Sequence, residues 1–451
     1  MYQDPGFLKG LTGEVVTVKD PAYDEARQEW NRSINKFPLV IVYCEGKHDV
    51  VNAICWARKH HVSIRIRSGG HHYEGYSTGD LVLVIDISRL NELKLDKQRN
   101  VLKMEAVAKN TEVYDLIGSN GYVFPGGTCP TVGVSGFTLG GGWGFSSRLY
   151  GLGCDSLIEL ELVDYQGRLI RANKYCNSDL FWACRGAGGG NFGVIVSMTF
   201  QLPEPTDCPV TLVRFYYVGT TSEKQAHVMN VWQNWLPGLD KRMTIVASFY
   251  NAEGEGLGIF ATGFFYGSSA RAREILQPFA EVEGFRVELE TSSFLETVKK
   301  VEETYPPSEK FKSTGRFVQR RYSPSELKNI ADLIQVSAGG SDYAAVSFYA
   351  MGGEITGTGK RETAFFYRNA RYIMGIQSVW TEDSAAEENR EWVRGRFEYI
   401  KSITEGSYVN FPISKLRNYE CEYFGENAKR LDKVNKKYDP YNVFKFPQGL
   451  K

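Results

Sequence analysis

The sequence has no excess of either charge and no long apolar run, and these absences exclude several kinds of partner. Lys and Arg together number 53 in 451 residues, as do Asp and Glu, so the formal net charge is zero. A basic excess is typical of chains whose main partner is nucleic acid or an anionic membrane. No run of 18 consecutive apolar residues occurs, so no membrane-spanning helix is expected. We therefore predict no nucleic-acid or membrane partner.

The sequence also lacks any Cys-x-x-Cys pair, because its eight cysteines are scattered. Without the spacing of zinc ligands, no metal site is expected. A chain of this length does not need disulfide bonds, so most of the cysteines are expected to be buried apolar side chains. The segment from Met1 to Gly6 has no basic region followed by an apolar stretch. This favours a cytoplasmic location.

The length and the change of composition along the chain predict two domains of α+β fold. At 451 residues, the chain exceeds the size at which single hydrophobic cores stop growing. Glycine-rich turns are concentrated in the first 200 residues, and aromatic-rich segments follow Pro203 and Pro205. We expect a first domain at residues 1–205 and a second at 206–395.

The hydrophobic pattern predicts alternating strands and helices in both domains. In the first domain, strands are expected at 38–43, 62–66, 81–85 and 101–107, and helices at 48–60 and 111–119. In the second, strands are expected at 213–217, 259–266 and 345–349, and helices at 270–277 and 323–334. Thr111 and Ser323 are the expected N-caps, with Pro324 as the first residue of its helix. The second pattern fits an antiparallel sheet covered by helices on one face.

Two glycine-rich turns each contain one nucleophilic side chain. The first runs from Arg67 to Gly75 and contains His71, and the second runs from Gly126 to Gly136 and contains Cys129. Glycine lets a backbone approach a ligand closely, so such turns can surround a diphosphate with N–H groups. An imidazole and a thiolate can both add to an electron-poor isoalloxazine ring. The turns therefore suggest a flavin held by two covalent bonds, which indicates redox chemistry.

Other nucleotide sites are not supported by the sequence. No Gly-x-Gly-x-x-Gly lies between a strand and a helix with an acidic residue about 20 positions later, and no P-loop is present. NAD and ATP are therefore not expected. Three further segments accompany the two turns: Gly140 to Gly144, Gly188 to Gly193, and Tyr438 to Phe444.

With these five segments in this order, the chain resembles the berberine-bridge-enzyme-like FAD-linked oxidases, a group of vanillyl-alcohol-oxidase-type flavoproteins. The resemblance covers nearly the whole chain. It implies a vanillyl-alcohol-oxidase-type FAD-binding domain, to which residues 396–451 return after the substrate domain. It also implies that His71 bonds to the 8α-methyl carbon of FAD and Cys129 to ring carbon 6, with His72 structural. The other FAD-binding residues that it implies are Arg67, Ser68, Gly69, Gly70, Thr131, Val132, Gly133, Gly136, Gly142, Gly144, Gly190, Asn191, Gly193, Val194, Tyr408 and Asn410.

Two positions bear on how the flavin would be tuned and reoxidised. Plant relatives often have histidine eight residues after the cysteine, where this chain has Phe137, so one hydrogen bond that tunes the flavin is expected to be absent. In the family, a small residue at the position of Val132 leaves space for dioxygen beside the flavin. Valine therefore favours an oxidase that forms hydrogen peroxide.

The substrate side of the site is less defined by the sequence. Oxidation by flavin needs a base while hydride passes to ring N5. Tyr408 begins the family's Tyr-x-Asn-aromatic segment and is either that base or a residue that packs on the ring and shapes the pocket. Gln377, on a strand expected at 372–380, could orient the substrate by hydrogen bonding. Side chains on a strand alternate between the two faces of the sheet, and the sequence does not decide which face Gln377 is on. Trp143 could form the pocket wall or belong to the core.

The combined expectation is an FAD-linked oxidase that acts on an alcohol, a sugar or a secondary metabolite, with dioxygen as the second substrate. Two alternatives stay open. One is a flavin dehydrogenase that passes electrons to another acceptor, and the other is a binding or structural protein that keeps the fold without turnover. The sequence indicates neither the substrate nor the oligomeric state.

Overall fold

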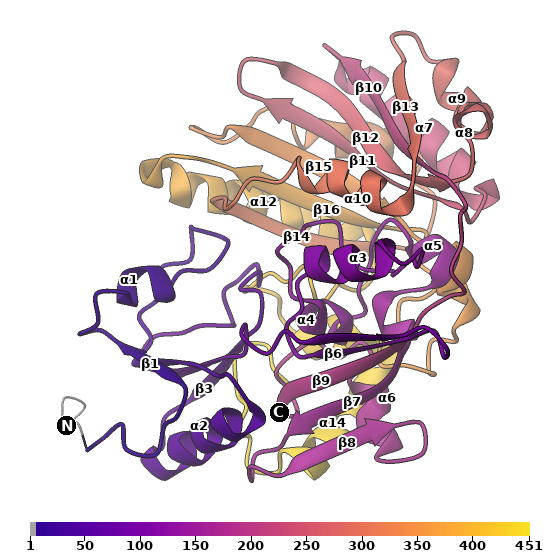
Figure 1. The fold of residues 1–451 in the computed structure, drawn as a ribbon. Helices are drawn as coiled ribbons and strands as arrows, with labels where there is room; N and C mark the ends of the chain where they lie inside the picture. Colours follow the sequence, from indigo (N-terminus) through magenta and orange to yellow (C-terminus); the bar gives the residue numbers. More distant parts are fainter. Residues whose placement is uncertain (1–5) are drawn as a thin grey trace.

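Three β-sheets organise residues 6–451, which the computed structural model describes (Figure 1). Residues 1–5, on which most of the expectation about a secretory segment rests, lie outside the described part. Two of the sheets belong to the first 201 residues, and the third is formed by strands from residues 210–379. The expected α+β architecture is confirmed.

The first sheet ends in one of the glycine turns. It has the order β1-β2-β4-β3, with β2, β3 and β4 parallel to one another. The strands are β1 (Glu14–Thr17), β2 (Val40–Tyr43), β3 (Ile64–Arg67) and β4 (Leu83–Asp86). Helix α2 (Lys47–His60) connects β2 to β3 and buries Val50, Ala53, Ile54 and Ala57. Since β3 ends at Arg67, the turn that follows lies at the carboxyl end of a parallel strand, where open α/β sheets commonly bind ligands.

The second sheet is antiparallel and has the order β5-β6-β9-β7-β8. Its strands are β5 (Leu93–Asp96), β6 (Val101–Glu105), β7 (Leu157–Val163), β8 (Leu169–Asn173) and β9 (Val194–Gln201). The segment between β6 and β7 contains the second glycine turn and helices α3 (Asn110–Gly118), α4 (Val134–Leu139) and α5 (Ser147–Tyr150). The C-terminal helix α14 (Ala428–Tyr438) packs against α6 (Ser178–Ala183), so the end of the chain returns to the first domain (Figure 1).

One expected helix cap is wrong. Helix α3 begins at Asn110, so Lys109 occupies the N-cap position and Thr111 lies in the first turn. The Lys109 backbone N–H donates to the Glu112 carboxylate (2.7 Å), which fixes the start of the helix two residues earlier than expected. The Thr111 hydroxyl instead donates to Glu302, the last residue of helix α10 (Phe294–Glu302), at 3.1 Å.

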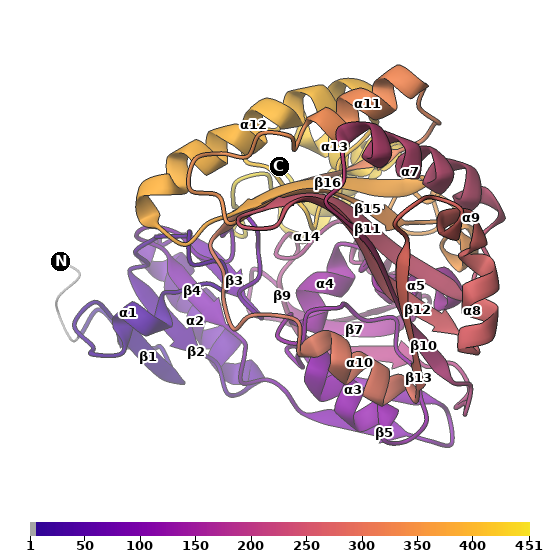
Figure 2. The ribbon, with the colours of Figure 1, turned by 90° about the horizontal axis from the view of Figure 1, so that it is seen from above.

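The third sheet is antiparallel, with the order β13-β10-β12-β11-β15-β16-β14. Its strands are β10 (Val210–Val218), β11 (Met243–Ala252), β12 (Gly256–Tyr266), β13 (Arg286–Ser292), β14 (Phe311–Val318), β15 (Tyr343–Ala350) and β16 (Tyr372–Val379). Figure 2 shows one face covered by α7 (Ser222–Trp235), α8 (Ser269–Ile275), α9 (Gln277–Ala280), α11 (Pro324–Asp332) and α12 (Ala386–Ile403). The expected helix-covered antiparallel sheet is confirmed, as are Ser323 as N-cap and Pro324 as the first residue of α11.

Side chains on the third sheet alternate between two cores. On β16, Tyr372, Met374 and Ile376 pack with the covering helices, whereas Ile373 packs with the first domain. Helix α10 (Phe294–Glu302) lies away from the covering helices and packs on α3. The uncovered face of the sheet is therefore turned toward the first domain, as Figure 2 shows.

The expected domain boundary at residue 395 falls inside helix α12. The helix continues to Ile403, and Ile400 still belongs to the helix-covered core. The chain returns to the first domain only after this helix, through a segment that includes α13 (Tyr419–Phe424). Gly406, two residues after the C-cap Thr404, marks this end in the sequence more closely than residue 395 does.

Arg368 forms a buried ion pair between the two domains, and its loss is expected to be strongly destabilising. Its guanidinium donates to both carboxylate oxygens of Asp155 (2.6 and 2.7 Å), and Arg368 is only 1% exposed. The variant Arg368→Met would leave the Asp155 carboxylate without its cation, at an expected cost of about 3–5 kcal/mol in the free energy of unfolding. A shift of the urea unfolding midpoint would measure this cost.

A matched control is the surface pair between Lys437 and Asp179 (2.7 Å), in which the lysine side chain is 58% exposed. Lys437→Met should cost at most about 1 kcal/mol, because exposed ion pairs contribute little. Equal shifts for the two variants would contradict the assignment of Arg368 as a buried interdomain anchor.

Candidate flavin and substrate site

The two glycine turns meet backbone to backbone. A Cβ atom added at Gly69 would overlap the backbone nitrogen of Gly133, and one added at Gly133 would overlap the Ser68 hydroxyl. The Ser68 and Ser135 hydroxyls lie 3.2 Å apart across the same contact. Only glycine permits this approach, so the backbones of the two turns are in direct contact.

His71 and Cys129 contact the same hydroxyl group. His71 Nε2 lies 2.8 Å from Thr131 Oγ1, and Cys129 Sγ lies 3.7 Å from the same oxygen. The ring of Trp30 stacks on His71 with centroids 5.0 Å apart. The 8α-methyl carbon and ring carbon 6 belong to the same end of an isoalloxazine ring. The two nucleophiles lie on the same threonine hydroxyl.

The surroundings of both nucleophiles set their protonation. Burial, together with the nearby Lys109 charge, lowers the pKa of His71 to about 4, so the imidazole is neutral. Because Nε2 contacts Thr131, Nδ1 is the nitrogen left for another bond. Burial raises the pKa of the Cys129 thiol, while the Thr131 hydroxyl and the backbone N–H groups of Thr131 and Val132 lower it. These donors would stabilise the thiolate.

His72 is engaged in local structure. Its Nδ1 accepts a hydrogen bond from the backbone N–H of Glu74 (3.2 Å), and its ring packs on Tyr76 with centroids 4.6 Å apart. Burial lowers the pKa of His72 to about 3. These contacts favour His71 over His72 as the attachment residue.

Arg67 lies behind the first turn. Its Nε donates to Asp86 at the end of β4, and its Nη1 lies 4.0 Å from Glu29 Oε1. Both partners are buried. The side chain therefore anchors the end of β3, so any contact of Arg67 with a cofactor would come from its backbone.

The Tyr408–Phe411 segment lies against the third glycine segment. The Tyr408 hydroxyl oxygen accepts hydrogen bonds from the backbone N–H groups of Gly142 (3.1 Å) and Trp143 (3.3 Å) and from Asn410 Nδ2 (3.1 Å). Asn410 Nδ2 also donates to the Phe137 carbonyl (3.0 Å). Two tight contacts among glycines complete this packing, since a Cβ atom at Gly140 would overlap Asn410 and one at Gly144 would overlap the Gly126 carbonyl.

Burial and hydrogen bonding act on the pKa of the Tyr408 phenol in opposite directions. Burial raises the pKa of its phenol to about 12, while its three N–H donors act in the opposite direction. The residue is 2% exposed. A phenol oxygen that faces three donors is stabilised when it becomes an anion, which is the form a proton acceptor needs.

The fourth glycine segment is tied to the end of the chain. Asn191 Nδ2 donates to the Ala187 carbonyl (3.0 Å), and Asn191 Oδ1 accepts from the backbone N–H of Leu450 (3.0 Å). Gly190 and Gly193 both have positive φ, at +80° and +149°. Val194 begins β9, and its side chain is buried in the first core. The backbone of this segment, rather than its side chains, is thus available to a ligand.

Trp143 and Gln377 lie on the substrate-domain side. Trp143 Nε1 donates to the carbonyl of Ala350 (2.8 Å), and its ring meets Tyr349 edge-on, so this buried residue joins the two domains. Gln377 pairs with Ser313 and Ala345 on the neighbouring strands. It alternates with the helix-facing Ile376 and is half-buried, so its side chain is on the face turned to the first domain.

Several tyrosines that the sequence did not single out gather at the same place. Tyr73 stacks on Phe411 with centroids 5.2 Å apart and ring planes 4° apart, and Tyr349 packs on the same ring at 5.3 Å. The Tyr305 hydroxyl lies 2.6 Å from the Thr128 hydroxyl, next to Cys129. Tyr73 directly follows His72 in the first glycine turn, so the sequence could have indicated its place in the site. Tyr305 is 177 positions from Thr128 in the chain, and nothing near it in the sequence indicates that the two residues meet.

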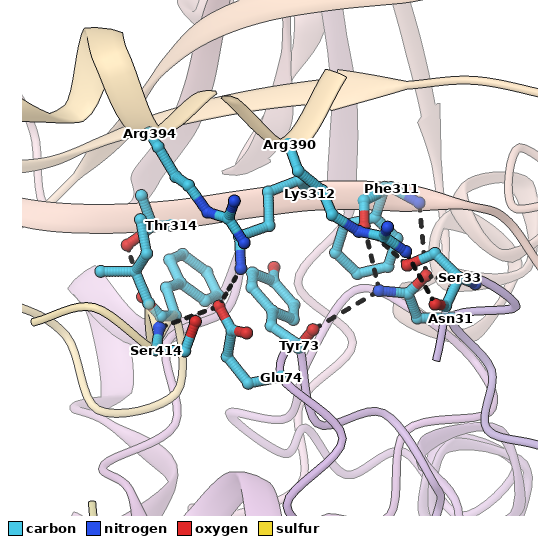
Figure 3. Close-up of polar contacts among 12 residues, drawn as sticks. Asn31, Ser33, Tyr73, Glu74, Phe311, Lys312, Thr314, Arg390, Arg394 and Ser414 are labelled. Atoms are coloured by element: carbon cyan, nitrogen blue, oxygen red, sulfur yellow. Dashed lines mark hydrogen bonds and ion pairs between the residues drawn. The ribbon is translucent and has the colours of Figure 1, made fainter. Parts of the chain in front are cut away.

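An ion pair joins the first turn to the third sheet (Figure 3). Lys312 Nζ contacts the Glu74 carboxylate, which also accepts from the backbone N–H of Ser414 (3.1 Å). Both charged side chains are at most 10% exposed, and burial lowers the pKa of Lys312. Asn31 Nδ2 donates to the carbonyls of Tyr73 and Phe311 (3.4 and 3.0 Å). The turn that contains His71 is thus held from both domains.

No group of three or more His, Cys, Asp or Glu side chains in residues 6–451 could hold a metal ion. None of the helices in the same part is both long enough and apolar enough to cross a bilayer.

Comparison with known proteins identifies the class of protein that this fold and site define. Residues 38–173 match the family model described as an FAD binding domain, and residues 407–451 match the one described as berberine and berberine like. The chain is 35% identical over 451 residues to an uncharacterized FAD-linked oxidoreductase of Bacillus subtilis, YgaK, with 98% of this chain and 97% of the relative covered. It is an FAD-linked oxidoreductase.

More particularly, the chain belongs to the berberine-bridge-enzyme-like family. It is 27% identical to berberine bridge enzyme-like D-1 of Nicotiana tabacum, over 92% of this chain and 82% of that protein. The solved structure of BBE-like 1 of Physcomitrella patens superposes with a TM-score of 0.90 at 25% identity, covering 99% of this chain and 98% of that one. The resemblance inferred from the five glycine and tyrosine segments is confirmed.

Proposed function

We propose that this protein is an oxidase whose FAD is attached covalently to both His71 and Cys129. It oxidises an alcohol, a sugar or a secondary metabolite and transfers the electrons to dioxygen, forming hydrogen peroxide. The observation that supports double attachment is the contact of both nucleophiles with the single hydroxyl of Thr131. The glycine turns beside them are proposed to bind the diphosphate of FAD through their backbone N–H groups, and glycine at positions 69 and 133 lets these turns meet.

The bound flavin would supply the hydride-accepting chemistry, and the chain would supply orientation and proton transfer. Tyr408 is the proposed proton acceptor, because the N–H groups of Gly142, Trp143 and Asn410 surround its oxygen and stabilise a phenolate. Gln377 is proposed to orient the substrate from the uncovered face of the third sheet. Tyr73, Tyr349 and Phe411 form the aromatic wall against which an apolar or sugar ring can pack.

Val132 supports an oxidase over a dehydrogenase. It is half-buried beside Cys129, and by the family resemblance a residue of this size leaves room for dioxygen. The relatives include a protein named tetrahydroberberine oxidase in Berberis wilsoniae, 27% identical over 91% of this chain and 84% of that protein. Intact His71, Cys129 and Tyr408 argue against a protein that keeps only the fold.

The proposed function is tested on the purified wild-type protein. The intact mass is expected to exceed that of the bare chain by one FAD, and the yellow colour should stay with the acid-denatured polypeptide. A panel of oligosaccharides, alcohols and phenolic metabolites should then bleach the flavin without oxygen, and admission of air should restore it with release of peroxide. Flavin extracted freely by acid would reject covalent attachment. If air reoxidised the bleached flavin only slowly and a quinone reoxidised it quickly, the protein would be a dehydrogenase.

A further inference from the structure

The two backbone N–H groups that face Tyr408 belong to consecutive peptide units. The Gly142 and Trp143 N–H groups both donate to the Tyr408 oxygen, at 3.1 and 3.3 Å. Successive N–H groups that point to one place form a small concave site for an anionic oxygen. This conformation depends on glycine, because Gly141 and Gly142 have φ values of +114° and +84°. The backbone is therefore shaped to receive a phenolate oxygen.

The opposite sides of the same two peptide units are held by the short 3₁₀-helix η1 (Gly153–Asp155). The Cys154 N–H donates to the Gly141 carbonyl (2.9 Å). The Gly153 N–H donates to the Gly142 carbonyl (2.8 Å). Because the C=O and N–H of a planar trans peptide unit point in opposite directions, a bond at each carbonyl fixes the direction of the N–H on the other side. Such a bond also makes that N–H a stronger donor, because hydrogen bonds in a chain polarise one another.

Asp155 holds helix η1 in place. Its carboxylate accepts from the backbone N–H of Leu152 (2.9 Å), which closes the start of the helix. The same carboxylate accepts from both Nη atoms of the buried Arg368 (2.6 and 2.7 Å). The Arg368 guanidinium also lies over the Phe365 ring, 5.4 Å from its centroid, and this ring meets Tyr408 edge-on with centroids 6.0 Å apart. The ion pair therefore supports the Tyr408 site both through the backbone and through an aromatic ring.

We propose that Asp155, held by Arg368, is a positioning residue for the proton acceptor. Through η1 it fixes the two backbone N–H groups that stabilise the Tyr408 phenolate. Within residues 6–451 no hydrogen bond joins Asp155 to Tyr408, so the carboxylate acts through the backbone. The inference rests on the proposed function, because it assigns the support of the same proton acceptor.

The test compares the wild type with Asp155→Ala and with Asp155→Ala/Arg368→Met. The double variant leaves no unpaired buried charge, so it keeps the test possible if the single variant does not fold. Amide hydrogen exchange, followed by mass spectrometry on peptides that cover residues 140–145, needs neither flavin nor turnover. Both variants should exchange these amides about tenfold faster than the wild type, because η1 no longer holds their peptide units.

The second measurement is the pH dependence of anaerobic flavin bleaching by substrate, expressed per bound flavin. In both variants the rate should rise with pH as in the wild type. It should lie about tenfold lower at each pH, because misdirected N–H donors raise the pKa of Tyr408 by about one unit. In the Tyr408→Phe background the same changes should slow bleaching no further, because the hydroxyl on which they act is gone.

The matched control is Asp164→Ala. Asp164 is a buried aspartate that accepts from the Gln166 and Arg168 backbone N–H groups (2.8 and 2.9 Å) and pairs with the Arg168 guanidinium, but it lies between β7 and β8. Its loss should leave the exchange of residues 140–145 and the pH profile unchanged. Unchanged exchange or bleaching in the Asp155 variants, or equal slowing with and without the Tyr408 hydroxyl, would overturn the inference alone. If Tyr408→Phe itself bleached at the wild-type rate, the proposed proton acceptor would be rejected, and the inference with it.

Discussion

Replacing both His71 and Cys129 with alanine is expected to abolish covalently bound flavin, whereas each single variant should keep one link. The reason is geometric, since each residue independently contacts the Thr131 hydroxyl and, within residues 6–451, no hydrogen bond joins one to the other. In the single variants the intact mass should still include one FAD, and acid should release none of it. In the double variant the mass should be that of the bare chain, and any flavin should be lost on acid denaturation.

The matched control for the histidine is His72→Ala. His72 is the adjacent residue of the same type, but its ring nitrogen already accepts the Glu74 N–H. Its loss should leave the covalent flavin in place. If His72→Ala removed the histidine link and His71→Ala did not, the assignment of the two neighbours would have to be exchanged. For the cysteine, the exposed Cys208 provides a control, and Cys208→Ala should leave the mass unchanged.

The family and its FAD-binding domain could be predicted because short segments of the chain carry the information. Two of these segments are glycine turns with one reactive side chain each, and the order of all five segments is characteristic of one family. The strands and the helix before the first turn and the helix-covered sheet could also be predicted, since they follow from the periodicity of apolar residues. These features depend on residues that are close together in the sequence.

The substrate side could not be predicted in the same way, because it is formed by contacts between distant segments. Tyr305 reaches the site through the Thr128 hydroxyl, 177 positions away in the chain. It has no neighbour in sequence that indicates such a role. The Glu74–Lys312 pair likewise joins residues 238 positions apart. Such pairs depend on how the domains dock, which local patterns do not encode.

The wrong N-cap at Thr111 has a different cause. Thr111 has a good capping side chain, but Glu112 competes by accepting the Lys109 N–H, and Glu302 offers Thr111 a partner outside the helix. Local propensity was thus overridden by one tertiary contact and one better local arrangement.

Tyr408→Phe is expected to slow anaerobic bleaching of the flavin by substrate about 10²- to 10⁴-fold, the usual contribution of a positioned proton acceptor. The variant removes only the hydroxyl, so the ring contacts with Phe317, Phe365 and Phe411 remain. A phenol with a pKa raised to about 12 acts as a base in its minor anionic form near neutral pH. The wild-type bleaching rate should therefore rise with pH over the range below that value, and the slow residual rate of the variant should lack this rise.

The alternative is that Tyr408 only packs and shapes the site, and the pH profile separates the two roles. A packing residue would give Tyr408→Phe a rate and a pH profile close to those of the wild type, because phenylalanine fills the same space. Tyr73→Phe is the matched control, since Tyr73 stacks on the same Phe411 ring but no hydrogen bond to its hydroxyl is seen in residues 6–451. If Tyr73→Phe alone removed the rise with pH, the proton would pass to Tyr73, and the three N–H donors at Tyr408 would serve only to hold the Tyr408–Phe411 segment against the glycine turn.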